Sequence, residues 1–240
     1  MKIRILALAI VVPAVLAGWA LTASAGGKNE NPGVLPPWSH AFGTTYAELT
    51  AMWWQWALEV PVDQCPIEDP DGRYAANGQE GKVWLLAGTS GWEAERTVTV
   101  PAGKAIFFPI VNNIWVTIPE SEKYSPGDPP FSVPGAEQIA RNAIIPVVDT
   151  LECEVDGKAL VISEDYRIQS PVFTAYMPID VWGFAPYIVD AGLYPDCVSD
   201  GYWILLAPLS KGKHTIHFRG GLGNTENPWF VEVTFHLTVK

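Results

Sequence analysis

Basic side chains are scarce in this 240-residue chain, and their scarcity excludes several classes of partner. Only 15 Lys and Arg residues stand against 26 Asp and Glu residues, which gives a formal net charge of −11 at pH 7. A surface this acidic repels the phosphates of nucleic acids and the headgroups of anionic lipids. We therefore expect neither a nucleic acid nor an acidic membrane surface as a partner.

Cysteine is also rare, with only Cys65, Cys153 and Cys197 in the whole sequence. An odd number leaves at least one thiol unpaired within the chain. Cys153 and Cys197 both flank predicted strands of the C-terminal half, which favours a disulfide between them. The alternative is three separate buried thiols, because free cysteine packs as a small hydrophobic side chain.

Motifs for catalysis or for transition metals are missing. The four histidines form no HExxH motif and no three-histidine cluster, and no G-x-S-x-G elbow marks a nucleophilic serine. Four carboxylates do gather within nine residues, at Asp63, Glu68, Asp69 and Asp71. A loop with several oxygen ligands suits Ca²⁺, so a calcium site is one hypothesis for this segment and a solvated turn is the other. No other cofactor is indicated.

Long apolar runs are absent except at the N-terminus. Lys2 and Arg4 precede an apolar stretch over residues 5–21, and the small residues 23–25 form a signal-peptidase site. We expect residues 1–25 to be a cleaved signal peptide and the protein to be secreted or periplasmic. The alternative is an uncleaved anchor, because about 20 apolar residues are enough to span a bilayer. No later segment is long and apolar enough to do so.

Residues 26–43 are rich in Gly and Pro and predict an irregular N-terminal arm. Thr45 and Glu48 have the spacing of a capping box and predict the start of a helix. Apolar residues over 139–151 predict a second helix, which Pro146 should kink or end.

Short β-rich segments make up most of the remaining chain. They are separated by turn residues and lie at 82–87, 96–100, 104–111, 151–155, 158–162, 167–176, 201–207, 213–219 and 229–239. About ten strands and two short helices predict a mainly β fold, an antiparallel β-sandwich or jelly roll, as a single domain over residues 44–240.

Tryptophan is the residue in excess, with 11 in the chain and three of them in the first predicted helix. Trp53 and Trp56 share a helical face with Leu49 and Met52, so we expect them to pack against the sheet. Trp54 points roughly 100° away from Trp53, and we expect it to be partly exposed.

The segment over residues 177–200 is the best candidate for a ligand site. It is rich in Pro, Gly and Asp, which predicts irregular structure, and it combines aromatic with acidic side chains. Aromatic rings stack on sugar rings, and carboxylates bind sugar hydroxyls. The predicted ligand-binding residues are Asp180, Trp182, Tyr187, Asp190, Tyr194 and Asp196. The alternative is a hydrophobic lid that closes one end of the sandwich.

Several segments together resemble a family of secreted bacterial proteins of unknown function. They are Trp53-Trp54-Gln55-Trp56, GQ at 78–79, VWLLAG at 83–88, VPAGK at 100–104, DGYW at 200–203 and HTIHF at 214–218. The resemblance covers most of the mature chain and implies an exported, single-domain protein. It implies no activity and no catalytic residues.

These features predict an exported protein that binds a glycan or another envelope protein, with no turnover of its own. One alternative is a secreted glycosidase, which needs two carboxylates about 5 Å or about 6.5–9.5 Å apart. Asp180, Asp190 and Asp196 would be the first candidates for that pair. A second alternative is a structural subunit of a surface assembly.

Overall fold

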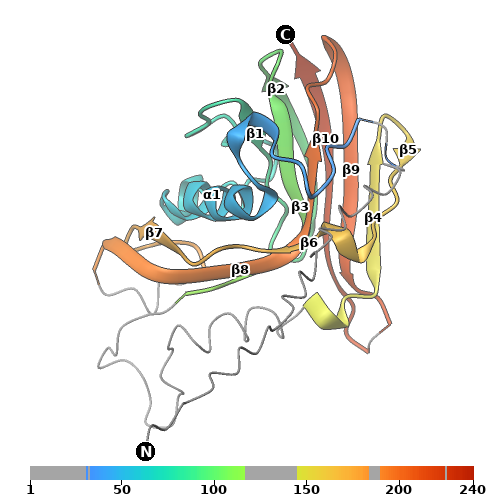
Figure 1. Cartoon of the computed structure of the whole chain (residues 1–240). Helices are drawn as coiled ribbons and strands as arrows, with labels where there is room; N and C mark the ends of the chain where they lie inside the picture. Colours follow the sequence, from blue (N-terminus) through green and yellow to red (C-terminus); the bar gives the residue numbers. More distant parts are fainter. Residues whose placement is uncertain (1–30, 32, 117–144, 184–189, 225) are drawn as a thin grey trace, which may run out of the picture.

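The computed structural model describes residues 31, 33–116, 145–183, 190–224 and 226–240, which form a mainly β protein with ten strands and one α-helix (Figure 1). The predicted fold class is therefore confirmed. The predicted signal peptide over 1–25 and the first part of the predicted second helix, 139–144, lie outside the described residues.

Two five-stranded sheets carry the fold. The inner sheet has the order β1-β3-β8-β6, and β7 pairs with β8 beyond the end of β3. The strands of the inner sheet are β1 (Val83–Leu85), β3 (Ala105–Trp115), β6 (Arg167–Gln169), β7 (Phe173–Met177) and β8 (Gly192–Leu206). The outer sheet has the order β2-β10-β9-β4-β5. Its strands are β2 (Glu93–Val100), β4 (Thr150–Val155), β5 (Lys158–Ala159), β9 (Gly212–Leu222) and β10 (Trp229–Val239).

Both sheets are mixed, whereas the sequence predicted antiparallel pairing. β1 runs parallel to β3, and β2 runs parallel to β10. The chain leaves the inner sheet after β1, forms β2 in the outer sheet and returns as β3. β1 and β3 are therefore joined by a long crossover, which parallel neighbours require and a tight hairpin does not supply.

The centre of the inner sheet is buried on both of its faces, whereas β7 and the start of β8 alternate between buried and exposed residues. On β3, Phe107 packs toward α1 (Tyr46–Leu58), whereas Ile106 and Phe108 pack toward the outer sheet. This explains why residues 105–111 of β3 and 202–206 of β8 form nearly continuous apolar runs instead of alternating ones. The result is three layers with a helix-side core and an intersheet core, and α1 lies across β7 and β8 (Figure 1).

Helix α1 begins at the predicted capping box. Thr45 Oγ1 accepts a hydrogen bond from the backbone N–H of Glu48, whose carboxylate accepts from the backbone N–H of Thr45. Four short 3-10 helices complete the helical content of the described residues. They are η1 (Ala41–Gly43), η2 (Val62–Gln64), η3 (Ile145–Val147) and η4 (Glu164–Tyr166). No helix among the described residues is long and apolar enough to cross a membrane.

Two predicted stretches differ from the structure. The end of the predicted second helix is the 3-10 turn η3 followed by β4, because Pro146 lacks the N–H that a continuing helix needs. The segment over 177–200 is not irregular throughout, since β8 begins at Gly192. The described part of the N-terminal arm is also attached to the fold, because Val34 bridges to Leu206 and is buried.

The three cysteines are separate buried thiols, so the predicted Cys153–Cys197 disulfide is wrong. Cys153 lies on β4 in the intersheet core, whereas Cys197 lies on β8 in the helix-side core with Cys65. The inner sheet separates these two cores. Burial raises the pKa of Cys65 to about 11 and that of Cys197 to about 12, which keeps both as thiols at neutral pH.

Candidate functional site

Most of the described residues predicted to bind a ligand do not line the cavity to which Trp182 belongs. The Asp180 carboxylate lies on an exposed turn, and Tyr194 is buried with its hydroxyl donating to the carbonyl oxygen of Asp190 at 2.8 Å. Asp196 is part of β8 and has a positive φ of 63°. Tyr187 lies outside the described residues.

Trp182 is the exception, because it lines a cavity of about 270 Å³. Six segments form the walls: α1, the turn after η2 that contains Ile67, the loop after β1, the end of β3, the turn after β7 and the start of β10. Their residues are Trp53, Trp54, Ile67, Gly88, Thr89, Ser90, Asn112, Asn113, Ile114, Trp182, Gly183, Trp229 and Val231. We call this space the indole cavity, after its four tryptophans.

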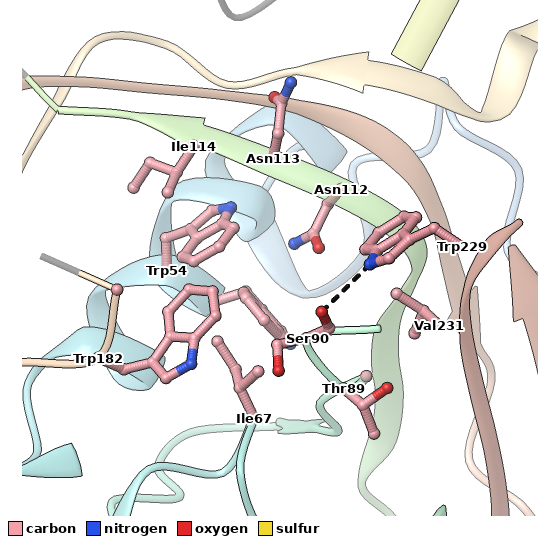
Figure 2. A pocket seen from close by; sticks show the side chains of 13 residues that line it. Trp54, Ile67, Thr89, Ser90, Asn112, Asn113, Ile114, Trp182, Trp229 and Val231 are labelled. Atoms are coloured by element: carbon pink, nitrogen blue, oxygen red, sulfur yellow. Dashed lines mark hydrogen bonds between the residues drawn. The ribbon is translucent and has the colours of Figure 1, made fainter. Parts of the chain in front are cut away.

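The indole rings lie on opposite sides of the cavity. Figure 2 shows Trp54 and Trp182 on one side, Trp229 on the other and the amide of Asn112 between them. Trp54 and Trp182 stack with their centroids 6.4 Å apart and an angle of 28° between the planes. Trp182 is fixed further by a hydrogen bond of 2.6 Å from its Nε1 to Glu68 Oε1.

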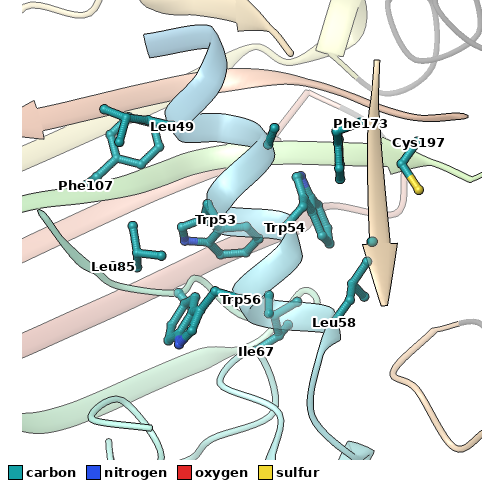
Figure 3. Close-up of a cluster of buried hydrophobic side chains, with 14 of the residues drawn as sticks. Leu49, Trp53, Trp54, Trp56, Leu58, Ile67, Leu85, Phe107, Phe173 and Cys197 are labelled. Carbon is teal, nitrogen blue, oxygen red and sulfur yellow. The ribbon is translucent and has the colours of Figure 1, made fainter. Parts of the chain in front are cut away.

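Trp54 is therefore buried, at 3% exposure, and the prediction of a partly exposed Trp54 is wrong. In Figure 3 its ring lies on the side of Phe173, whereas Trp53 lies on the side of Leu85. The turn that carries Trp182 covers the flank of α1 that a helix on a bare sheet would leave open. The predicted burial of Trp53 and Trp56 is confirmed, while Met52 is 46% exposed and not part of the buried face.

A glycine lets Trp229 reach its place. Gly91 has a φ of 119°, and a Cβ atom built on it would lie 2.0 Å from Trp229 Nε1. The same indole nitrogen donates to the carbonyl oxygen of Ser90 at 3.3 Å (Figure 2). The turn at residues 90–91 therefore fits the edge of the ring only because Gly91 has no side chain.

The polar groups of the cavity are amides and hydroxyls, and none of its lining side chains is charged. Asn112 and Asn113 follow each other on β3, and Asn113 Oδ1 accepts from the backbone N–H of Asp200 at 3.3 Å. The hydroxyl of Thr89 donates to the carbonyl oxygen of Trp92 and is thus already engaged. Asn112 and the exposed Ser90 are the polar side chains placed to meet a ligand.

Arg96 does not line the cavity, but it fixes two of the segments that do. The alternation of β2 points it inward, where its side chain is buried at 1% exposure. Its guanidinium donates to the carbonyl oxygens of Ala87 at 2.6 Å, Gly88 at 3.2 Å and Ile67 at 3.0 Å. Burial lowers the pKa of Arg96 to about 10, which leaves it charged at neutral pH. Two of its three acceptors belong to lining residues.

The acidic cluster suggested as a calcium site consists of Asp63, Glu68, Asp69 and Asp71. The Asp69 carboxylate is buried and accepts hydrogen bonds from the four backbone N–H groups of residues 71–74. Asp71 forms an ion pair with Arg73 at 2.6 Å, and Glu68 binds Trp182. No three His, Cys, Asp or Glu side chains of the described residues are arranged to hold a metal ion. These carboxylates order the loop, and the calcium site stays a prediction that their arrangement does not support.

A row of Ser210, His214 and Asp156 resembles a nucleophile triad but is not arranged as one. His214 Nδ1 lies 2.7 Å from Asp156 Oδ2, and its Nε2 lies 3.4 Å from Ser210 Oγ. The same Nε2 lies closer, at 2.8 Å, to the carbonyl oxygen of Ser210, to which it must donate. Both ring nitrogens therefore act as donors, and the Asp156 carboxylate raises the pKa of His214. A ring nitrogen that donates to a carbonyl oxygen has no lone pair free to activate a serine.

Sequence reasoning found Trp182 but missed the rest of the cavity. Asn112, Ser90 and Trp229 come from three separate segments, and nothing in their local patterns indicates a shared site. Gly91 beside Ser90 was a weak signal, since a conformationally free glycine often marks a close approach of another group.

Comparison with known proteins assigns no family to the chain. No protein-family model matches it, and no curated protein matches it. The solution structure of amebosin aligns with 65% of this chain and 96% of its own chain, at 11% sequence identity and a TM-score of 0.20. A TM-score this low supports no common fold. The resemblance to a family of secreted bacterial proteins stays a prediction.

Proposed function

We propose that this protein is exported and binds an uncharged carbohydrate in the indole cavity. The observation that carries the proposal is the lining itself, in which four indole rings surround a few amide and hydroxyl groups. Indole faces stack on the C–H surfaces of sugar rings, while amides and hydroxyls bind the ring hydroxyls.

The size and charge of the cavity limit the class of ligand that it can bind. Its volume of about 270 Å³ lies just below the usual range for small-molecule sites, which leaves room for one or two sugar units of an oligosaccharide. None of the lining side chains carries a charge that would compensate a buried carboxylate or phosphate. A neutral sugar is the ligand class that this lining suits best.

The same lining favours binding over hydrolysis. A glycosidase of the usual kind needs two carboxyl groups that face each other across the substrate. The described lining of the indole cavity contains no Asp or Glu, and the carboxylate of Glu68, which contacts the lining residue Trp182, accepts the hydrogen bond from its indole N–H. Asp180, Asp190 and Asp196 are not among the lining residues.

Export rests on the predicted signal peptide and on the resemblance to secreted proteins. The test is to express the full chain in a Gram-negative bacterium and to sequence the N-terminus of the protein recovered from the periplasm or the medium. We expect the mature chain to start at Gly26. Full-length protein retained with the membrane would contradict this part of the proposal.

Binding is tested by titrating the purified mature protein with a panel of neutral oligosaccharides while tryptophan fluorescence is recorded. Trp182→Ala should abolish the response, because it removes one aromatic side of the cavity. Trp38→Ala is the matched control, since Trp38 is 52% exposed and does not line the cavity. Equal binding by the Trp182 variant, or no binding of any sugar by the native protein, would refute the proposed function.

A further inference from the structure

The indoles of the cavity offer a ligand their rings but not their N–H groups. Trp53 Nε1 donates to the carbonyl oxygen of Leu86 at 2.8 Å, Trp182 Nε1 to Glu68 and Trp229 Nε1 to Ser90. Trp54 Nε1 is buried within the wall, where it has no hydrogen-bond partner among the described residues. The surface that the four side chains leave for a ligand is therefore made of C–H groups and π faces.

These rings stand on two sides, so both faces of a bound sugar ring meet apolar surface (Figure 2). The polar side chains that remain, Asn112 and Ser90, are few and lie between the indoles. A pyranose with only equatorial hydroxyls has C–H groups on both faces and its hydroxyls around the rim. An axial hydroxyl would instead point at an indole face, which offers no oxygen or N–H group in exchange for the water that the hydroxyl loses.

We propose that the indole cavity selects sugars whose ring hydroxyls are all equatorial, the gluco configuration, and rejects their axial epimers. This inference rests on the proposed carbohydrate binding and names its substrate class. It also assigns Glu68 as a positioning residue. Its carboxylate fixes the plane of Trp182 through the 2.6 Å hydrogen bond, and the angle of that plane decides whether an axial group fits.

The experiment compares three trisaccharides by isothermal titration calorimetry on the mature protein: cellotriose, β-1,4-mannotriose and β-1,4-galactotriose. Each unit of the second differs from glucose by an axial hydroxyl at C2. In the third the axial oxygen is at C4, where it is a free hydroxyl only on the non-reducing terminal unit. We expect cellotriose to bind at least about tenfold more tightly than either epimer, because an axial hydroxyl would lose a hydrogen bond to water.

Variants of Glu68 test how the selection arises. Glu68→Ala frees the indole of Trp182 and should reduce the ratio of the cellotriose to the mannotriose affinity to about one. Glu68→Gln keeps a side-chain oxygen that accepts from Trp182 Nε1, so it should retain the preference. A general loss of stability would lower all three affinities together and leave their ratio unchanged.

The outcomes separate this inference from the proposed function. Equal affinity for the three trisaccharides, or a preference for an axial epimer, would overturn the inference while carbohydrate binding stands. Binding of none of them, with another neutral sugar of the panel bound, would do the same. If no sugar binds at all, both fail. If the ratio of the cellotriose to the mannotriose affinity is unchanged in Glu68→Ala, Glu68 is not a positioning residue.

Discussion

Replacing Gly91 by alanine should damage both the stability of the protein and its cavity. Two effects add up in this variant. An alanine at a φ of 119° costs about 1–2 kcal/mol in backbone strain. The new Cβ atom would also lie 2.0 Å from Trp229 Nε1, 2.7 Å from its Cδ1 and 2.9 Å from its Cε2, so the ring must move. It then loses its hydrogen bond to Ser90 and part of its packing, about 1–3 kcal/mol more.

The two effects are separable because other glycines show the first without the second. Gly103 has a φ of 85° and Gly212 a φ of 136°, and a Cβ atom on either meets nothing within 4 Å. Gly103→Ala and Gly212→Ala should therefore cost about 1–2 kcal/mol each, against about 2–5 kcal/mol for Gly91→Ala. The free energies of unfolding come from urea denaturation followed by circular dichroism.

A double-mutant cycle identifies the ring as the cause. In a Trp229→Ala background the steric conflict is absent, so Gly91→Ala should cost no more than the two control glycines do. If Gly91→Ala costs the same with and without the ring, the close approach of Trp229 to this turn is wrong.

Three further outcomes are expected. Arg96→Met should lower the free energy of unfolding by about 2–4 kcal/mol, because three buried carbonyl oxygens lose their donor. Arg73→Met, at the exposed ion pair, should cost less than about 1 kcal/mol. Equal losses of the two variants in urea denaturation would refute this role of Arg96. The raised pKa of His214 stabilises the fold fully below the unfolded value of about 6.5, and this contribution is lost as the pH rises through the folded pKa. The melting temperature of native protein minus that of His214→Gln should therefore be larger at pH 5.5 than at pH 8.5, and a constant difference would argue against it. The three buried thiols should react with a thiol reagent only after unfolding, and the unfolded chain should show three reactive thiols without added reductant. A count of one reactive thiol would mean that two of the cysteines form a disulfide.

Local chemistry predicted the elements of this fold well. The capping box of Thr45 and Glu48 marks the true start of α1, and the alternating residues of β10 form the expected half-buried strand. The pair Asp156-Gly157, a combination typical of two-residue hairpins, connects the paired strands β4 and β5 with φ values of 51° and 73°. Each of these signals depends on residues within a few positions of one another, which is why the sequence alone contains them.

The cavity could not be predicted in the same way, because its walls depend on how distant segments pack. The burial of Trp54 requires Trp182, which lies 128 positions away in the chain, and the period of a helix says nothing about such a neighbour. The first half of β8 could not be predicted as a strand for a related reason. Pro195 and Asp196 are unfavourable in a strand, and only the pairing with β7 shows that the chain is extended there.

The length of β8 links ligand binding to global unfolding. This strand pairs with β7 over residues 192–197 and continues without interruption into its pairing with β3. A fluctuation that detaches β8 from the centre of the sheet therefore also removes the partner of β7, next to which Trp182 stands. A ligand bound in the cavity would therefore oppose the unfolding of the entire sandwich, by RT ln(1 + [L]/Kd), and not only the motion of a single loop. The occupied protein should thus melt as one cooperative unit at a higher temperature.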